Sequence, residues 1–184
     1  TKKSDTFFVR SDIEIYHYAK IFINKLFSEY DINSEHLIFD QMILPYHMKK
    51  FDLLLPNLKQ IVVDRDPRDV YLDAKNYNAY PITNNIQSFI SFYETARNLK
   101  KIKNDEKNLK INFEDLIYNY NSTTKGITDF LNITGNNEKF KYSRFNPNIS
   151  IKNTKTWLRE TNPKVLNDIK TIENKLEKWC YDFK

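Results

Sequence analysis

The sequence predicts an α/β protein with a parallel β-sheet flanked by helices, and three observations support this class. Short apolar runs alternate along the chain with longer segments of helical periodicity, which is the order of elements in α/β folds. The short runs are apolar on consecutive residues, as in parallel strands that are buried on both faces. The length of 184 residues suits one domain, 1–184, with a sizeable core.

Three of the apolar runs are predicted as strands. KQIVVD, residues 59–64, is β-branched and apolar at its centre. HLIFD, residues 36–40, is a shorter run of the same kind, and a third strand is expected at 109–113 within LKINFEDL. Each run closes on acidic residues, so each strand is expected to end where charged side chains begin.

Helices are predicted before, between and after these strands. Ser11-Asp12-Ile13-Glu14 has the form of a capping box and opens a helix that runs to about Tyr30. Pro67 suits the first turn of a helix that continues to about Tyr77. Further helices are expected at 45–55, 85–101, 121–133 and 163–180.

Charged side chains follow all three predicted strands. Asp40, Arg65 and Glu114 each stand at the carboxyl end of a strand. In open parallel sheets, ligands bind beyond that edge. The sequence therefore predicts a ligand site where these three residues converge.

Composition narrows the class of partner only slightly. The chain has 29 basic and 24 acidic residues, a net charge of +5, which favours an anionic partner weakly. A general bias toward Lys and Asn explains the same balance, and no basic stripe with interleaved aromatic residues indicates nucleic acid. A single cysteine excludes an internal disulfide framework, and no apolar run is long enough for a transmembrane segment.

Two glycines, Gly126 and Gly135, are too few for a GxGxxG fingerprint or a GxxxxGK phosphate loop within these residues. A P-loop kinase is therefore a weak alternative. The chain begins with Thr1 rather than Met, which indicates a processed or incomplete product.

Three segments resemble the sulfotransferases that use 3′-phosphoadenosine-5′-phosphosulfate (PAPS). IVVDRDPRDVYLDAK resembles their "RdPrDv…S" segment, INFEDLIYNYNSTTKGITDFLNI is similar to their "YEDL" segment, and ISIKNTKTWLRE is similar to their closing segment. The matches occur in the family's order over roughly residues 37–180. The closest likeness is to bacterial members that act on surface polysaccharides, and it implies a P-loop-NTPase-like sulfotransferase fold.

The resemblance assigns donor-binding roles to several residues. It implies that Arg65 holds the 3′-phosphate, where a guanidinium gives paired, charge-assisted hydrogen bonds. The resemblance also implies that Phe113 lies near the adenine and that Lys152 and Lys155, which flank Trp157, belong to a basic loop over the phosphates. The alternatives are an Arg65 that pairs with Asp69 or Asp73 to fix the turn, a Phe113 that belongs to the core, and a Trp157 that anchors its loop.

The sequence also departs from the family pattern. The glycine-containing phosphosulfate loop and its strand are not found in these residues, and the family's serine eight residues after the arginine is Asp73. A carboxylate about 4 Å from one phosphate charge costs on the order of 4 kcal/mol at an effective dielectric constant near 20. We therefore expect Asp73 to turn away and pair with Lys75 or Arg68, or the ligand to lack a 3′-phosphate.

The resulting expectation is sulfuryl transfer from PAPS to a hydroxyl acceptor, expected to be a carbohydrate, with no metal and no nucleic-acid partner. Asp40 is the candidate catalytic base and His47 the second candidate. No lysine occurs near Asp40 before Lys49, which favours the alternative of a non-catalytic nucleotide- or glycan-binding relative. The expected location is cytoplasmic, with peripheral attachment to the inner membrane as an option.

Overall fold

The protein is described by a computed structural model whose residues divide into two compact units. The units are Thr1–Leu58 and Lys59–Lys184, and each is treated by itself. The prediction of one domain stays a prediction. The structure describes residues 11–29, 36–40, 51, 53–55, 57–77, 85–98, 104–134 and 141–183.

The first unit contains helix α1, Asp12–Glu29, which confirms the helix expected after the capping box. The Ser11 hydroxyl accepts a hydrogen bond from the backbone N–H of Glu14 at 3.3 Å, so one end of the box forms as predicted. No side chain of α1 is buried.

HLIFD is not a strand, which corrects the prediction for residues 36–40. These residues have no regular secondary structure. Ile38 is 83% exposed, and the ring of Phe39 stacks on Phe27 of α1 with centroids 5.6 Å apart. A short apolar run becomes a strand only when a neighbour supplies its ladder of hydrogen bonds, and here its aromatic residue packs on a helix instead. Of the helix predicted at 45–55, residues 45–50 lie outside the described residues.

The second unit is built on two parallel strands, β1 (Gln60–Asp64) and β2 (Asn108–Asn112). They pair in register from Gln60 opposite Asn108 to Asp64 opposite Asn112. The Phe113 N–H donates to the Asp64 carbonyl at 2.7 Å, which extends the ladder by one bond. Both predicted strands and their parallel direction are confirmed, so the fold belongs to the α/β class.

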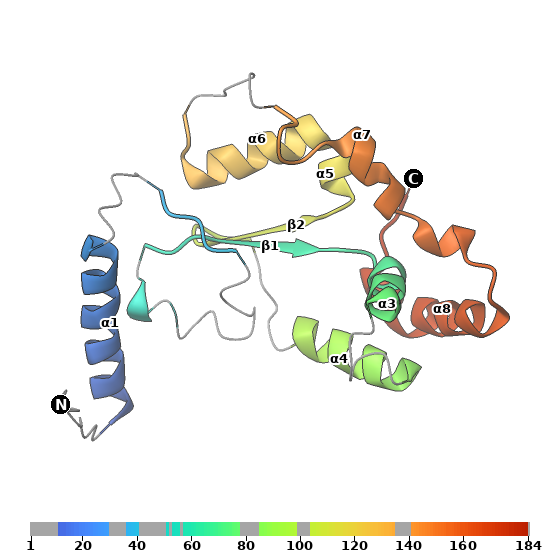
Figure 1. Cartoon of the computed structure of the whole chain (residues 1–184), viewed down its shortest axis with the longest axis horizontal. Helices are drawn as coiled ribbons and strands as arrows, with labels where there is room; N and C mark the ends of the chain where they lie inside the picture. Colours follow the sequence, from blue (N-terminus) through green and yellow to red (C-terminus); the bar gives the residue numbers. More distant parts are fainter. Residues whose placement is uncertain are drawn as a thin grey trace, which may run out of the picture. The chain divides into compact units, whose positions relative to one another are not determined.

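Helices α3 (Pro67–Asn76), α4 (Ile86–Asn98) and α8 (Pro163–Leu176) gather beyond the carboxyl end of β1 (Figure 1). Together they enclose the core. Its buried apolar residues are Tyr71, Leu72, Phe89, Ile90, Tyr93, Val165, Ile169, Ile172 and Leu176.

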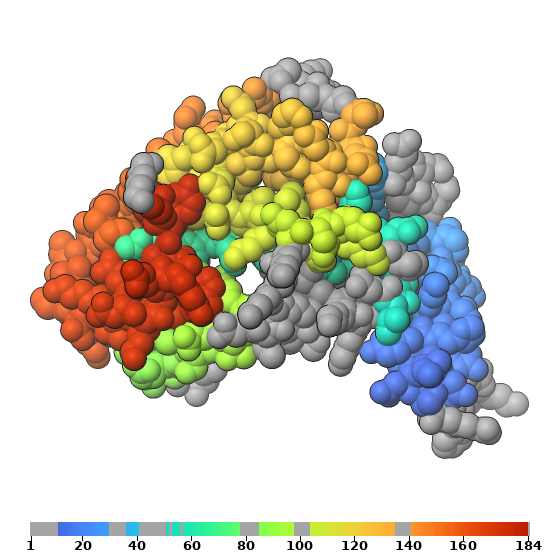
Figure 2. Space-filling view, turned by 180° about the vertical axis from the view of Figure 1, so that it is seen from behind, coloured from blue at the N-terminus to red at the C-terminus, as the bar shows by residue number. Residues whose placement is uncertain are grey.

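Shorter elements complete the second unit. Helices α5 (Asp115–Tyr118) and α6 (Tyr120–Leu131) follow β2, and α6 lies along it (Figure 1). Figure 2 shows α6 (yellow) and α8 (red) as separate masses at the surface, with the start of β2 between them. The last stretch contains α7 (Pro147–Ser150), η3 (Ile151–Asn153), η4 (Thr156–Arg159) and η5 (Glu177–Trp179).

Two long helices begin with the same device, an Asx residue followed by proline. The Asp66 carboxylate accepts from the N–H of Arg68 at 2.8 Å at the start of α3. Asn162 accepts from the N–H of Lys164 at 3.0 Å at the start of α8. Proline fits the first turn because a backbone N–H at that position would have no acceptor within the helix, so its absence costs nothing. This device fixes the start of α3 directly after β1.

Candidate functional site

Arg65 stands between β1 and α3, where the parallel strands end. Its guanidinium pairs with the Asp73 carboxylate of α3 through Nη1. Nη2 donates to the Asn153 carbonyl at 2.6 Å. The guanidinium carbon lies 5.2 Å from the centre of the Phe113 ring, which follows β2. Arg65 thus joins three segments that are far apart in the sequence.

The pairing of Arg65 with Asp73 differs from the expectation that Asp73 would turn away from it. Neither Lys75 nor Arg68 is its partner, because Lys75 approaches Asp168 at 4.0 Å and Arg68 pairs with Asp66 at 2.6 Å. The geometry matches the alternative in which Arg65 fixes the turn between strand and helix. The pair remains accessible, with the Arg65 side chain 20% exposed and that of Asp73 40%.

Asp69 attaches the later segment to α3. Its buried carboxylate accepts from the backbone N–H of Lys155 at 2.9 Å, and from the N–H and hydroxyl of Thr156 at 2.7 and 2.5 Å. Burial raises the pKa of Asp69, and the hydrogen bonds from Thr156 oppose that shift. Asp69 therefore positions the loop that contains Lys155.

Lys155 has a left-handed backbone with φ of 53°, an uncommon conformation for a residue with a side chain. Its ammonium lies 4.5 Å from the centre of the Phe183 ring and 5.5 Å from that of Tyr118. The charge is thus held against aromatic residues. The structure brings the Lys155 backbone close to the Arg65 segment, while its ammonium contacts the end of the chain.

Trp157 and Lys152 occupy different surroundings. Trp157 packs against the core, and its ring lies 3.9 Å from the guanidinium carbon of Arg68. Lys152 is exposed, and its carbonyl accepts from Arg159 at 2.5 Å. Trp157 therefore anchors its loop to the core, which is the alternative to a contact with the ligand.

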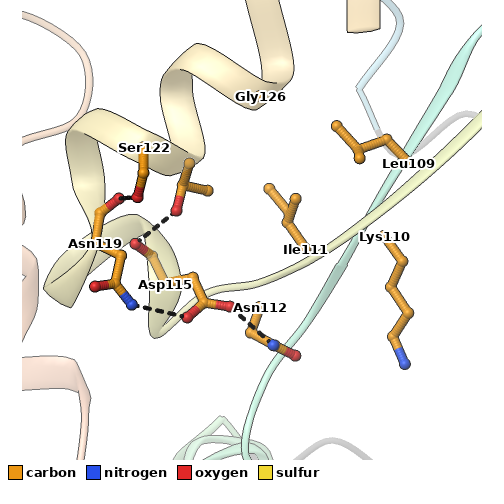
Figure 3. Close-up of a pocket in the computed structure, with 9 residues that line it drawn as sticks. Leu109, Lys110, Ile111, Asn112, Asp115, Asn119, Ser122 and Gly126 are labelled. Carbon is orange, nitrogen blue, oxygen red and sulfur yellow. Dashed lines mark hydrogen bonds between the residues drawn. The ribbon is translucent and has the colours of Figure 1, made fainter. Parts of the chain in front are cut away.

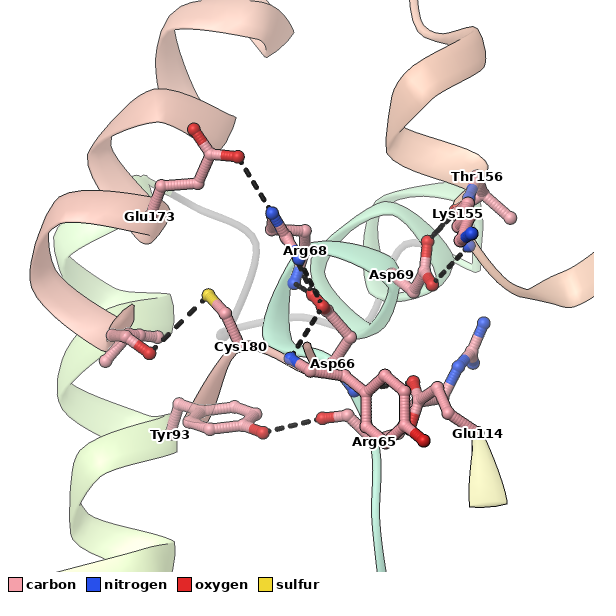
Figure 4. Close-up of polar contacts among 12 residues, drawn as sticks. Arg65, Asp66, Arg68, Asp69, Tyr93, Glu114, Lys155, Thr156, Glu173 and Cys180 are labelled. Atoms are coloured by element: carbon pink, nitrogen blue, oxygen red, sulfur yellow. Dashed lines mark hydrogen bonds and ion pairs between the residues drawn. The ribbon is translucent and has the colours of Figure 1, made fainter. Parts of the chain in front are cut away.

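Near Arg65, three carboxylates are buried (Figure 4). Asp66, Asp69 and Glu114 are each at most 1% exposed. Arg68 compensates Asp66 through hydrogen bonds from Nε and Nη2 at 2.9 and 2.6 Å. Burial tends to lower the pKa of Arg68, but the bonds and charge of Asp66 hold it above its ordinary value.

The Glu114 side chain binds the turn between β1 and α3 and forms no capping hydrogen bond to α5, the helix that it precedes. One oxygen accepts from the Asp66 N–H at 2.9 Å, and the other has no hydrogen-bond partner among the described residues. Burial raises the pKa of Glu114, and the nearby charges of Asp66 and Asp69 act in the same direction. Its position directly after a buried strand was the available signal. The sequence alone did not indicate that it turns inward.

The two predicted catalytic residues, Asp40 and His47, belong to the first unit. Asp40 is exposed at a bend in the first unit, and the strand that was expected to carry it is not formed. His47 lies outside the described residues. Their catalytic roles stay predictions.

A hollow of about 320 Å³ lies between β2 and α6 (Figure 3). None of the predicted site residues lines it. Asp115, the acidic residue that lines it, accepts from Asn112 at 2.9 Å, Asn119 at 3.3 Å and the Tyr181 hydroxyl at 2.6 Å. Burial tends to raise the pKa of Asp115, but these bonds outweigh it and lower the pKa. The polar wall of the hollow is thus engaged in internal bonds, and the Arg65 region is the better candidate.

No protein-family model, curated protein or solved structure matches the chain. Among the described residues, no helix combines the length and apolar composition needed to cross a bilayer.

Proposed function

We propose that this chain belongs to a sulfotransferase that moves a sulfuryl group from PAPS to a hydroxyl acceptor, expected to be a carbohydrate. One observation supports the proposal most directly. The three segments that resemble the family, 61–75, 111–133 and 149–160, meet at the carboxyl end of β1 and β2 through Arg65, Phe113 and Asn153. Such convergence is what a shared ligand site requires, because the segments are far apart in the sequence.

The surroundings of Arg65 suit a nucleotide that carries a phosphate. The guanidinium offers a planar set of donors to phosphate oxygens. Phe113 lies beside it and offers an aromatic face for a base. Burial of most of the Arg65 side chain strengthens its electrostatic interaction with an anion relative to that in bulk water.

Asp73 opposes the same ligand, because it already occupies Nη1 of Arg65. A 3′-phosphate would bind only after the carboxylate swings away, and Asp73 is sufficiently exposed to do so. Arg65 and Phe113 therefore fit the donor, whereas Asp73 fits it only in a second side-chain position.

The proposed chemistry needs in-line attack of the acceptor hydroxyl on sulfur and a base for the hydroxyl proton. Asp40 remains the first candidate base and His47 the second. Arg65 would hold the bisphosphate as it leaves, which is a positioning and charge-stabilising role.

The pair of Arg65 and Asp73 favours a second candidate function. A relative that has kept the fold but binds a nucleotide or glycan without transferring a group has no need of a free arginine. In that case, the ion pair is permanent and serves only the turn.

Calorimetry with adenosine 3′,5′-bisphosphate tests the proposal, with AMP as the ligand that lacks the 3′-phosphate. Binding that prefers the bisphosphate by at least about tenfold, and that disappears in Arg65→Ala, is the expected result. Arg144→Ala is the matched control, since Arg144 is an exposed arginine of the same unit. Asp73→Ser should bind the bisphosphate more tightly than the natural chain. The donor site would be refuted if the natural chain bound the bisphosphate no better than AMP. It would also be refuted if Arg65→Ala bound the bisphosphate as tightly as the natural chain.

A further inference from the structure

The positive charge of the chain is concentrated in the stretch 141–164, here called the basic segment. It contains one acidic residue, Glu160, and six basic residues: Lys141, Arg144, Lys152, Lys155, Arg159 and Lys164. Its net charge of +5 equals that of the whole chain. The rest of the chain is therefore neutral overall.

Three of the six basic residues in the segment have no ion pair within the described part of the chain. Arg144, Arg159 and Lys164 form no ion pair with a described carboxylate, in contrast to Arg65 and Arg68 at the end of β1. Arg159 contacts a neutral carbonyl, that of Lys152. The segment thus presents a positive potential to its surroundings.

Apolar side chains project from the same segment. Ile149 is 61% exposed, Ile151 46% and Leu158 62%. They belong to α7, η3 and η4, three consecutive elements. The bond from Arg159 to the Lys152 carbonyl holds η4 against η3. In Figure 2 the segment (orange) runs along the upper left margin of its unit, at the surface.

We propose that the basic segment docks on the surface of a bilayer that contains anionic lipids. Its lysines and arginines would lie at the headgroup phosphates, while Ile149, Ile151 and Leu158 enter the boundary between headgroups and acyl chains. Surfaces that combine exposed aliphatic and basic side chains bind membranes in this way, without spanning them.

The aliphatic residues select a membrane over a dissolved polyanion. A nucleic acid offers charge to the basic residues, but its apolar contacts are stacked bases that favour aromatic partners. Ile149, Ile151 and Leu158 gain from transfer to an apolar phase, which a bilayer supplies and a hydrated polyanion does not. The basic segment includes Lys152 and Lys155 of the proposed nucleotide site, but the residues changed in the test below, Ile149, Leu158, Arg144 and Lys164, lie outside that site.

Vesicle sedimentation of the full chain tests this proposal. The vesicles are pure phosphatidylcholine or phosphatidylcholine with about 30% phosphatidylglycerol, at salt concentrations of about 50 and 500 mM. The apolar variant is Ile149→Ser with Leu158→Ser, and the charge variant is Arg144→Gln with Lys164→Gln. The controls are Phe92→Ser, which alters a residue 49% exposed on α4, and Lys170→Gln on α8. Circular dichroism verifies that each variant is folded.

We expect binding to the anionic vesicles alone, weakened at high salt, with each double variant binding at least about tenfold more weakly and both controls binding normally. Absence of binding to anionic vesicles would overturn the proposal. So would an apolar variant that binds as well as the natural chain, since charge alone would then account for the association. Binding to heparin or single-stranded DNA but not to vesicles would identify a polyanion as the partner instead. None of these results depends on bisphosphate binding, so the two proposals can fail separately.

Discussion

The end of β1 and the basic segment are both rich in arginine and lysine, but they use the charge differently. At the end of β1, Arg65 pairs with Asp73, and Arg68 pairs with Asp66 and Glu173. In the basic segment, Arg144 and Lys164 face no described carboxylate. Paired, buried charge specifies how the chain folds, whereas uncompensated charge at the surface is available to a partner. Four predictions test that difference.

The largest expected effect is that of Arg68→Ala. The change leaves the Asp66 carboxylate buried without its cation and removes the stack on Trp157. Loss of one partner of a buried pair costs about 3–5 kcal/mol of unfolding free energy. Urea unfolding measures it.

Arg68→Lys is the matched control for this prediction. Lysine keeps the charge but cannot form the fork of hydrogen bonds, so an intermediate loss is expected. A loss below about 1 kcal/mol for Arg68→Ala would mean that the pair contributes no more than a surface ion pair.

Asp69→Ala should have the next largest effect. It removes the acceptor for two N–H groups and one hydroxyl at Lys155 and Thr156, all partly buried, which is expected to cost about 2–3 kcal/mol. Release of the loop should also accelerate tryptic cleavage after Lys155. Asp69→Asn keeps one acceptor oxygen, so its stability should lie between those of Asp69→Ala and the natural chain. Unchanged cleavage in Asp69→Ala would show that other contacts hold the loop.

Glu114→Gln should change the pH dependence of stability. Because burial raises the pKa of Glu114 above its ordinary 4.5, the folded chain binds this proton more tightly than the unfolded chain. The contribution of Glu114 to stability therefore falls as the pH rises from about 4.5 through the raised pKa. Glutamine does not titrate, so the unfolding free energy of the variant relative to the natural chain should increase over that window.

Urea unfolding at several pH values between about 5 and 7 measures this difference. Asp115→Asn is a useful contrast, because the pKa of Asp115 is lowered rather than raised. Its stability relative to the natural chain should stay constant between about pH 5 and 7 and should fall with increasing pH only below about pH 4, where Asp115 titrates. If the unfolding free energies of Glu114→Gln and the natural chain changed in parallel with pH, the raised pKa of Glu114 would be contradicted.

The smallest effect is expected in the basic segment. Arg144→Gln with Lys164→Gln should change the unfolding free energy by no more than about 0.5 kcal/mol, because both side chains are exposed and neither forms an ion pair with a described residue. A loss above about 1 kcal/mol would show that these charges stabilise the fold, and the contrast with the end of β1 would disappear.

The sequence predicted those elements whose signals are local. β1 and β2 were recognisable as β-branched, apolar runs, and α3 by its proline start. HLIFD carried a similar signal but formed no strand, because strand formation depends on a partner that no local pattern specifies. The site shows the same division. Arg65 was identified from its place after a strand, whereas the choice of Asp73 as its partner depends on how the side chain lies along α3.

The inward position of Glu114 was also beyond local reasoning. An acid that follows a strand and precedes a helix is expected to cap that helix. The hydrogen bond that buries Glu114 against Asp66 can be predicted only when β1 and β2 are known to pair, because it joins the segments that follow the two strands. Tertiary pairing therefore decided the role of Glu114, and the same applies to the attachment of Lys155 by Asp69.

Asp69 and Asp73 lie one turn apart on α3, and each is joined to the loop 153–156. Asp69 holds the loop directly, while Asp73 holds Arg65, which in turn holds the Asn153 carbonyl. The loop is therefore attached to α3 at two places, directly at Asp69 and through Arg65 at Asp73. An anion that displaced Asp73 would break the exposed ion pair between Arg65 and Asp73 and leave the buried hydrogen bonds of Asp69 intact. The loop would then still be held by Asp69, by the hydrogen bond between Tyr118 and Thr154 and by the packing of Trp157, so occupancy at Arg65 would loosen only the start of the loop at Asn153.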